Sequence, residues 1–313
     1  MWVKIGDKGA SVKEIQRLLG IKADGDFGGG TEAAVKKFQQ SRGLKADGEV
    51  GDNTYAALIS FTSDISDGTF IDNDGILDRR GSYTTVDGLL IDKVYMDTDE
   101  YVTDRGTTDK DTIFIHHTAG RANPYKTAKN WNLDTRGRIA TQYIIGGMSL
   151  NGNTEHDGTV VECFPDEYFA WHLGKTGSHH MHTHSIGIEL NNWGYLYKDG
   201  DDYFNYVDIK VPKEQVARLP KKFNGYYYYH KYTDAQVQSL KLLIHEIARR
   251  HPKVDICLGL PEMLMNMDTF AAFGFNKAAY DGKIKGILTH TNVRRDKTDC
   301  YPDNRLVTML KSL

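Results

Sequence analysis

The sequence contains few cysteines and no marked excess of either charge. Its three cysteines, Cys163, Cys257 and Cys300, are odd in number and widely separated, unlike the even spacing of a small domain held by disulfides. We therefore expect reduced thiols. Lys and Arg number 39 against 42 Asp and Glu, a formal net charge of -3. No overall charge attracts the chain to nucleic acid, so we expect no nucleic-acid partner.

Long apolar segments are also missing. The sequence has no run of about 18 apolar residues, the length that crosses a membrane, so we expect no membrane insertion. The N-terminal stretch "MWVKIGDKGASVKEIQ" lacks the apolar region of a signal peptide. The expected location is therefore the cytoplasm, and any target outside the membrane is reached by another route. Its 40% hydrophobic content over 313 residues predicts a soluble globular protein of about two domains.

A repeated segment near the N-terminus is the first clear pattern. The stretch "KADGDFGGGTEAAV" begins at Lys22, and "KADGEVGDNTYAAL" begins at Lys45. Each copy predicts a glycine-rich turn that leads into a helix, with Thr31 and Thr54 as the N-caps. A further helix is predicted over "SVKEIQRLLG", where apolar residues recur at helical spacing. Residues 1–61 are therefore predicted to form a small domain of three short helices.

This segment resembles the peptidoglycan-binding domain of many cell-wall hydrolases. The family pattern "G..G..V..IQ..L" followed by "DG.FG..T..AV..FQ...GL..DG..G..T...L" is filled at nearly every position, from Gly6 to Leu58. The resemblance implies bacterial peptidoglycan as a binding partner. The repeat alone would also suit a helical spacer or dimerisation unit. The pattern does not tell which side chains touch glycan.

The composition changes after Phe61, where Asp, Gly, Ser and Thr dominate and regular periodicity is lost. We interpret residues 62–87 as a linker and residues 88–313 as the second domain. There, "LLIDKVYM" is a candidate first strand. Strand-like segments alternate with helix-like ones, which predicts an α/β fold with a mixed central sheet flanked by helices. The strands are predicted at 112–116, 142–146, 159–164, 185–190, 225–229 and 286–290.

Helices are predicted between these strands. The longest covers "TDAQVQSLKLLIHEIARRH", with Thr233 and Gln236 as a capping box and Pro252 as the stop. Others are predicted over "NPYKTAKNWN", "PEMLMNMDTFAAF" and "NRLVTMLKSL".

Two adjacent histidines end the strand "TIFIHH". His116 and His117 point to opposite faces if both are extended, so only one can reach a given cleft. A second strand, "GILTH", delivers His290, which Asp299 and Cys300 follow closely. Two strand-end histidines with an acid or a thiol form the ligand set of a catalytic zinc, with the fourth position open for water. Each histidine could equally be structural.

Together, "IFIHHTAG", "QYIIGG", "AWHLG", "HSIGIEL", "TDAQ" and "THTNVRRDKTD" resemble the zinc-dependent N-acetylmuramoyl-L-alanine amidases, a superfamily that includes the peptidoglycan-recognition proteins. The resemblance spans about residues 111–302. It implies that His116 and His290 bind Zn²⁺ and that His117 packs behind. The family motif "KTDPGP" is matched by "KTDCYP", which implies Asp299 as the third ligand. Some members use a cysteine followed directly by proline, so Cys300 retains a weaker claim.

The resemblance also assigns the remaining site residues. It implies Glu189 as the general acid and base, and Lys297 as the group that stabilises the oxyanion. A buried Glu189 is costly unless it is paired or used, although a salt bridge would also explain it. His172 in "AWHLG" is expected to bind substrate. The run "HHMHTH" from His179 is predicted to be a solvated loop rather than a second metal site.

The resulting hypothesis is a monomeric amidase that cuts the bond between N-acetylmuramic acid and L-alanine in peptidoglycan. A binding domain before an amidase domain, without a signal peptide, resembles phage endolysins, which wait in the host cytoplasm before lysis. One alternative is a bacterial autolysin. Another is a non-catalytic recognition protein, which the complete set of expected site residues disfavours. A recycling amidase acting on small muropeptides would not need the N-terminal domain.

Overall fold

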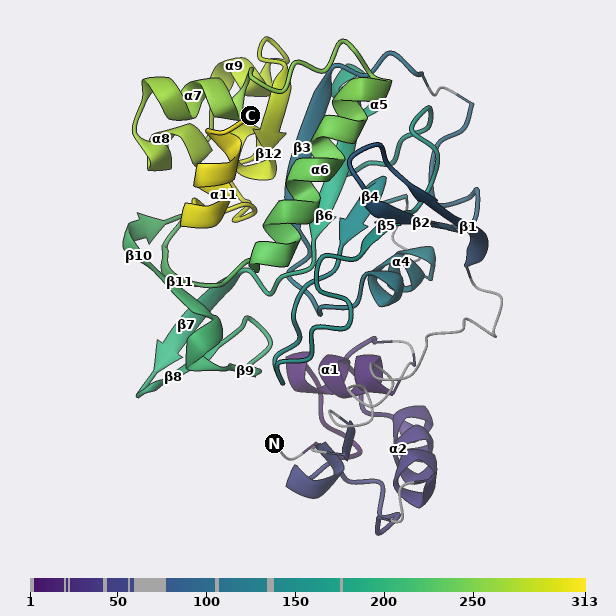
Figure 1. The fold of residues 1–313 in the computed structure, drawn as a ribbon. Helices are drawn as coiled ribbons and strands as arrows, with labels where there is room; N and C mark the ends of the chain where they lie inside the picture. Colours follow the sequence, from purple (N-terminus) through teal and green to yellow (C-terminus); the bar gives the residue numbers. More distant parts are fainter. Residues whose placement is uncertain are drawn as a thin grey trace. The chain divides into compact units, whose positions relative to one another are not determined.

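The structure is a computed structural model that describes residues 3–19, 21, 23–41, 44–55, 57–58, 77–104, 107–133, 138–174 and 177–313. The chain divides into two compact units, Met1–Ile71 and Asp72–Leu313. Each is drawn in Figure 1. Among the described residues, none of the helices combines the length and apolarity needed to span a bilayer.

The N-terminal unit contains the helices α1, Ala10–Leu18, and α2, Gly29–Ser41, and residues 52–55 are also helical. Its core is formed by apolar residues of these helical segments. Val12, Ile15, Val35 and Leu58 are all fully buried. The predicted helical domain is therefore present in the described part of the unit.

The two copies of the repeat form the same hydrogen-bond network. In the first, the Gln16 amide donates to Asp24 Oδ1, at 2.8 Å, and to Thr31 Oγ1, at 3.0 Å. Its carbonyl accepts from the Gly25 backbone N–H at 2.8 Å. Gly25 has φ +79, a left-handed conformation that glycine adopts without strain.

The second copy places Gln39 at the centre of an equivalent network. Its amide donates to Asp47 Oδ1 at 2.9 Å and to Thr54 Oγ1 at 3.1 Å, and it accepts from Gly48 N at 2.9 Å. Thr31 lies inside α2, and Thr54 lies inside the helical residues 52–55, so the prediction of both as N-caps is wrong. Each threonine hydroxyl instead accepts a hydrogen bond from the glutamine amide of its own copy. A buried amide needs such a partner.

A seven-stranded mixed sheet forms the centre of the C-terminal unit, in the order β1-β2-β5-β4-β6-β3-β12. Strands β3, β6 and β12 run parallel to one another, whereas β1 and β2 form an antiparallel pair. The predicted fold class is thereby confirmed. The strands are β1 Asp78–Thr84, β2 Leu90–Tyr95, β3 Thr112–His117, β4 Tyr143–Ile145, β5 Val160–Glu162, β6 Ser185–Leu190 and β12 Gly286–Thr289.

Strand β1 lies within residues 62–87, which the sequence predicts as a linker. Residues 62–76 are outside the described part of the chain, but β1 pairs with β2, and Tyr83 Oη donates to Glu162 on β5 at 3.1 Å. The sheet therefore begins about ten residues earlier than the predicted boundary at 88. The Asp- and Ser-rich composition concealed this strand, because its stability comes from pairing rather than from apolar residues.

Helices cover both faces of the sheet, as Figure 1 shows for α6. Side chains alternate along each strand, so Tyr143 and Ile145 pack into one core with α6, whereas Ile144 packs into a second core with Ala128 of α4. The capping box of Thr233 and Gln236 is confirmed. The helices are α4 Pro124–Asn132, α5 His179–Thr183, α6 Asp234–Arg250, α7 Leu260–Asn266, α8 Thr269–Phe273, α9 Lys277–Tyr280, α10 His290–Val293 and α11 Asn304–Leu310.

A second, five-stranded sheet arises from the tyrosine-rich segment between β6 and α6. Its order is β10-β11-β7-β8-β9. The strands are β7 Tyr195–Asp199, β8 Asp202–Phe204, β9 Lys210–Val211, β10 Val216–Phe223 and β11 Tyr226–His230. At the turn between β10 and β11, the Asn224 side chain donates to the Lys297 carbonyl at 2.8 Å. This sheet therefore contacts the loop that carries Lys297.

Candidate metal centre

Three neighbouring parallel strands, β6, β3 and β12, bring Glu189, His116 and His290 to the same end of the central sheet. His116 on β3 lies opposite Glu189 on β6 in the strand register. On the other side of β3, Thr289 pairs with Ile115, so His290 follows at the level of His116. Residues aligned in register on adjacent strands present their side chains on the same face. The pairing of the strands therefore places His116 and Glu189 side by side.

His116, His290 and Asp299 form a buried cluster of candidate metal ligands. The two Nδ1 atoms of His116 and His290 lie 3.1 Å apart. Asp299 Oδ2 is 3.0 Å from His290 Nδ1 and 3.3 Å from His116 Nδ1. In the described part of the chain, this is the group of three histidine, cysteine or acidic side chains whose ligand atoms converge.

The geometry of this cluster suits zinc. Two ligands at about 2.0–2.1 Å from a tetrahedral zinc ion are separated by about 3.3 Å. The three observed separations are close to that value. Two imidazole nitrogens and one carboxylate oxygen also match the donor types of catalytic zinc sites, which leave a fourth position open. The residues present therefore fit the ion that the sequence predicts.

The electrostatics of the cluster favour a neutral His116 imidazole beside an ionised Asp299 carboxylate. Burial lowers the pKa of His116 to about 4, so its ring is neutral at pH 7. Burial by itself would raise the pKa of Asp299, but its interactions with His290 and His116 hold it well below its ordinary value. Neutral imidazole and ionised carboxylate are the forms that bind a metal.

The neighbouring His117 lies on the opposite face of β3. Its Nδ1 is 2.9 Å from the Tyr232 hydroxyl. Gly194 lies so close that a Cβ there would be 2.7 Å from His117 Nε2. Of the two adjacent histidines, the structure thus brings His116 to the cluster and packs His117 in the interior.

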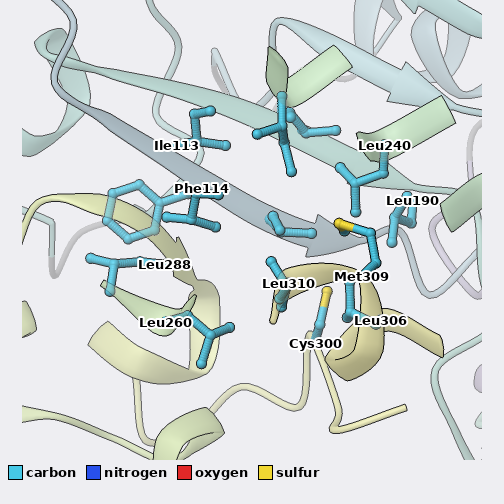
Figure 2. Packing of buried hydrophobic residues seen from close by; sticks show 14 of the residues in the cluster. Ile113, Phe114, Leu190, Leu240, Leu260, Leu288, Cys300, Leu306, Met309 and Leu310 are labelled. Atoms are coloured by element: carbon cyan, nitrogen blue, oxygen red, sulfur yellow. The ribbon is translucent and has the colours of Figure 1, made fainter. Parts of the chain in front are cut away.

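Asp299 and Cys300 likewise point into different surroundings. Figure 2 shows Cys300 among the apolar side chains Leu306, Met309 and Leu310, and it is fully buried there. Burial raises the pKa of the Cys300 thiol well above its ordinary value, which disfavours the thiolate that zinc requires. Within the described residues, Asp299 is therefore the third member of the cluster.

Glu189 has a strongly perturbed acidity. Burial, with a further contribution from the Asp299 carboxylate, raises the pKa of Glu189 well above its ordinary value, although Lys297 opposes this shift. A carboxyl group that both takes up and releases a proton near neutral pH needs a raised pKa. Lys297 is half-buried on the loop before Asp299. Its interaction with Glu189 and His116 places its charge in the same site.

His172 is placed differently from its predicted role in substrate binding. Its Nδ1 lies 3.1 Å from His116 Nε2, and its Nε2 lies 2.8 Å from the Ser185 hydroxyl. The side chain is buried. Since both ring nitrogens have partners inside the protein, the structure favours an interior role for His172 over the predicted contact with substrate.

The histidine-rich run from His179 is not the predicted solvated loop. Ser178 caps the short helix α5, because its hydroxyl accepts from the Met181 N–H at 3.1 Å. His182 is fully buried, with Nε2 3.1 Å from the Gly174 carbonyl. Among the described residues, this run contributes to no three-ligand cluster. The loop prediction failed because α5 has only five residues, HHMHT. So short a segment shows no apolar periodicity that would mark a helical turn.

Family models match both units. Residues 8–58 match a peptidoglycan binding domain, and residues 106–302 match the N-acetylmuramoyl-L-alanine amidase family. The second match covers more than half of the chain. The chain belongs to the N-acetylmuramoyl-L-alanine amidase family.

Solved structures show more distant likenesses. A fused Zn-dependent amidase/peptidase/peptidoglycan-binding domain-containing protein from Clostridium acetobutylicum is 40% identical over 18% of this chain and 28% of that one, with a TM-score of 0.18. A selenomethionine AmpD derivative is 16% identical over 69% of this chain and 92% of that one, with a TM-score of 0.37. AmpDh3 from Pseudomonas aeruginosa is 20% identical over 49% and 50%, with a TM-score of 0.30. No curated protein sequence matches the chain.

Ser185 and Asn224 belong to the surroundings of the site but were not predicted from the sequence. Ser185 and Glu189 lie on the same face of β6, and each is two positions from Gly187. The small residues in "SIGIEL" were a signal for this close packing. Asn224 is distant in sequence from Lys297, and no local pattern connects them.

Proposed function

We propose that this protein hydrolyses the amide bond between N-acetylmuramic acid and L-alanine in peptidoglycan. The observation that carries the proposal is the converging cluster of His116, His290 and Asp299 beside Glu189, in a chain of the amidase family. We assign the cluster to Zn²⁺. The peptidoglycan-binding match at residues 8–58 supports the same substrate.

We assign a role to each residue on the basis of its position in the site. His116, His290 and Asp299 would hold zinc, which would act as a Lewis acid to polarise the amide carbonyl and lower the pKa of a water molecule. Glu189, whose own pKa is raised, takes the proton of the attacking water and passes it to the leaving amine of L-alanine. The Lys297 ammonium stabilises the oxyanion that develops on the carbonyl oxygen.

Hydrolysis at this bond has a product pattern that distinguishes it from other wall-cutting reactions. Digestion of purified peptidoglycan should release new alanine amino termini and leave the number of reducing sugar ends unchanged. The matched control is Glu189→Gln, which keeps the shape of the side chain and removes its basicity. New reducing ends, or alanine termini released equally by the variant, would contradict the proposal.

The same cluster separates an enzyme from a non-catalytic recognition protein. A recognition protein of this fold needs neither a complete ligand set nor a carboxyl group with a raised pKa. His116, His290, Asp299, Glu189 and Lys297 are all present in this chain. The arrangement therefore favours catalysis.

We further propose that the protein acts as a phage endolysin, held in the host cytoplasm until the membrane is opened. The support is the presence of a wall-binding segment and an amidase segment in one chain. Cell fractionation tests the proposal. The expressed protein should stay in the cytoplasmic fraction, and cells should lyse only after the membrane is permeabilised. Recovery of the protein outside the membrane in intact cells would favour an autolysin instead.

A further inference from the structure

A chain of hydrogen-bonding groups extends from the metal cluster into the interior. His116 Nε2 lies 3.1 Å from His172 Nδ1, and His172 Nε2 lies 2.8 Å from Ser185 Oγ. The exposed fractions of His116 and His172 are 2% and 6%, and Ser185 is fully buried. Water therefore does not replace these partners.

The chemistry of the cluster fixes the direction of both hydrogen bonds. His116 faces His290 and Asp299 through Nδ1, so this nitrogen carries the lone pair that binds a metal. In a neutral imidazole the other nitrogen then bears the hydrogen. His116 Nε2 must therefore donate to His172 Nδ1. Since His172 Nδ1 accepts this hydrogen bond, the ring hydrogen of His172 is on Nε2, which donates to the Ser185 hydroxyl.

The strand β6 is shaped to hold His172 in this position. Ser185, Gly187 and Glu189 alternate along one face of β6, the face that also carries His116 of β3 in register. A Cβ at Gly187 would lie 3.2 Å from His172 Cγ. The absent side chain thus leaves room for the imidazole to pack on the strand, between the serine that binds it and the glutamate of the site.

We propose that His172, held by Ser185, is a positioning residue that fixes the tautomer and ring orientation of His116 for zinc. This inference rests on the zinc of the proposed function. A histidine ligand whose second nitrogen is hydrogen-bonded keeps its orientation and gains basicity, and loss of such a partner typically weakens metal binding by about 10–100-fold. His172 serves the metal through His116 and makes no contact with substrate.

Zinc affinity of the full chain, measured by competition with a chelator, tests the proposal. His172→Phe keeps an aromatic ring but loses the acceptor at the Nδ1 position, and we expect zinc to bind about 10–100-fold more weakly. In His172→Asn, the side-chain oxygen occupies nearly the position of Nδ1 and can accept from His116. Its affinity should return to within about threefold of the parent value. Ser185→Ala should give an intermediate loss.

His182→Phe is the matched control. His182 is as buried as His172 and its ring centroid lies 5.5 Å from it, but the ring makes no hydrogen bond to His116. Zinc affinity should be unchanged in this variant. The unfolding temperatures of the metal-free proteins report separately on folding.

The outcomes distinguish this inference from the proposed function. A parent protein that binds no zinc would overturn both. If the parent binds zinc and His172→Phe binds it equally well, only the positioning role is wrong. Equal weakening in the Phe and Asn variants of His172, or in His182→Phe, would show that ring packing rather than the acceptor matters, and would also overturn it. If His172→Phe does not fold, an unchanged affinity in Ser185→Ala has the same consequence.

Discussion

The N-terminal unit builds one arrangement twice, whereas the C-terminal unit builds its site once, from distant segments. The glutamine networks join residues only 8 to 15 positions apart, and the second copy reproduces the first. The two cluster histidines are 174 positions apart. They meet because strand pairing brings β3 next to β12. A local arrangement can be duplicated with its sequence, but a site that depends on the whole sheet exists only once.

We therefore expect a substitution to have different consequences in the two units. Loss of one glutamine network leaves the other copy in place, whereas loss of one metal ligand removes the reaction. The experiments below test this contrast, beginning with the largest expected effect.

The metal cluster is the most sensitive place in the chain. Removal of zinc with a chelator should abolish hydrolysis, and added zinc should restore it, because no other described group supplies the same polarisation of the carbonyl. His116→Ala should lose the metal, whereas His117→Ala should keep it, since His117 contacts Tyr232 on the other face of β3. Elemental analysis of the purified variants measures this. Equal loss of metal in both variants would contradict the assignment.

The acid-base residue should rank next. Glu189→Ala should keep zinc but lower turnover by about 100-fold or more, as expected when a positioned proton-transfer group is removed. Lys297→Ala should show a similar loss through weaker stabilisation of the oxyanion. Steady-state rates on a soluble muropeptide, with the zinc content determined in parallel, provide the measurement. Near-parental turnover with full zinc occupancy would exclude the role of the residue concerned.

Removal of the N-terminal unit should lower the rate of hydrolysis only on polymeric peptidoglycan. A chain beginning at Leu77 retains β1 and should cleave soluble muropeptides at the parental rate. On insoluble sacculi it should be slower by about tenfold or more, because tethering raises the local concentration of the catalytic unit. Turbidity loss of sacculi and release of soluble product are measured side by side.

A second truncation separates tethering from folding. A chain beginning at Gly88 also loses β1 and the hydrogen bond from Tyr83 to Glu162, so it should unfold at a lower temperature than the chain beginning at Leu77. If the chain from Leu77 clears sacculi as fast as the parent, residues 1–61 are not the wall anchor.

The smallest effects are expected in the repeated networks. Gln16→Ala and Gln39→Ala each leave buried partners unsatisfied, which should destabilise the N-terminal unit by about 1–3 kcal/mol. Hydrogen exchange of the amides in α1 and α2 measures this loss in the full chain. The exposed neighbour Gln40→Ala is the control and should change stability by less than about 0.5 kcal/mol. Unequal losses of stability in Gln16→Ala and Gln39→Ala would show that the two copies are not equivalent. The rate of hydrolysis of soluble substrate should remain unchanged in all three variants.

Much of the fold could be predicted from local patterns. The α6 capping box at Thr233 and Gln236 and the strand Ser185–Leu190 have the predicted ends, because hydrophobic period and capping chemistry act over a few residues. Strand β1 was missed because its sequence is polar and its stability comes from β2. The helix α5 was missed because five residues carry too little periodicity to distinguish a helical turn from a loop.

The sequence by itself determined which residues are available for the site, because His116, Glu189, His290 and Asp299 all stand in recognisable motifs. It also determined that His116 and His117 point apart, since side chains alternate along a strand. Only the tertiary structure decided that Asp299 faces the histidines while Cys300 enters the core, and that His172 lies behind His116. Such orientations depend on packing between segments far apart in the chain, and no local sequence pattern contains that information.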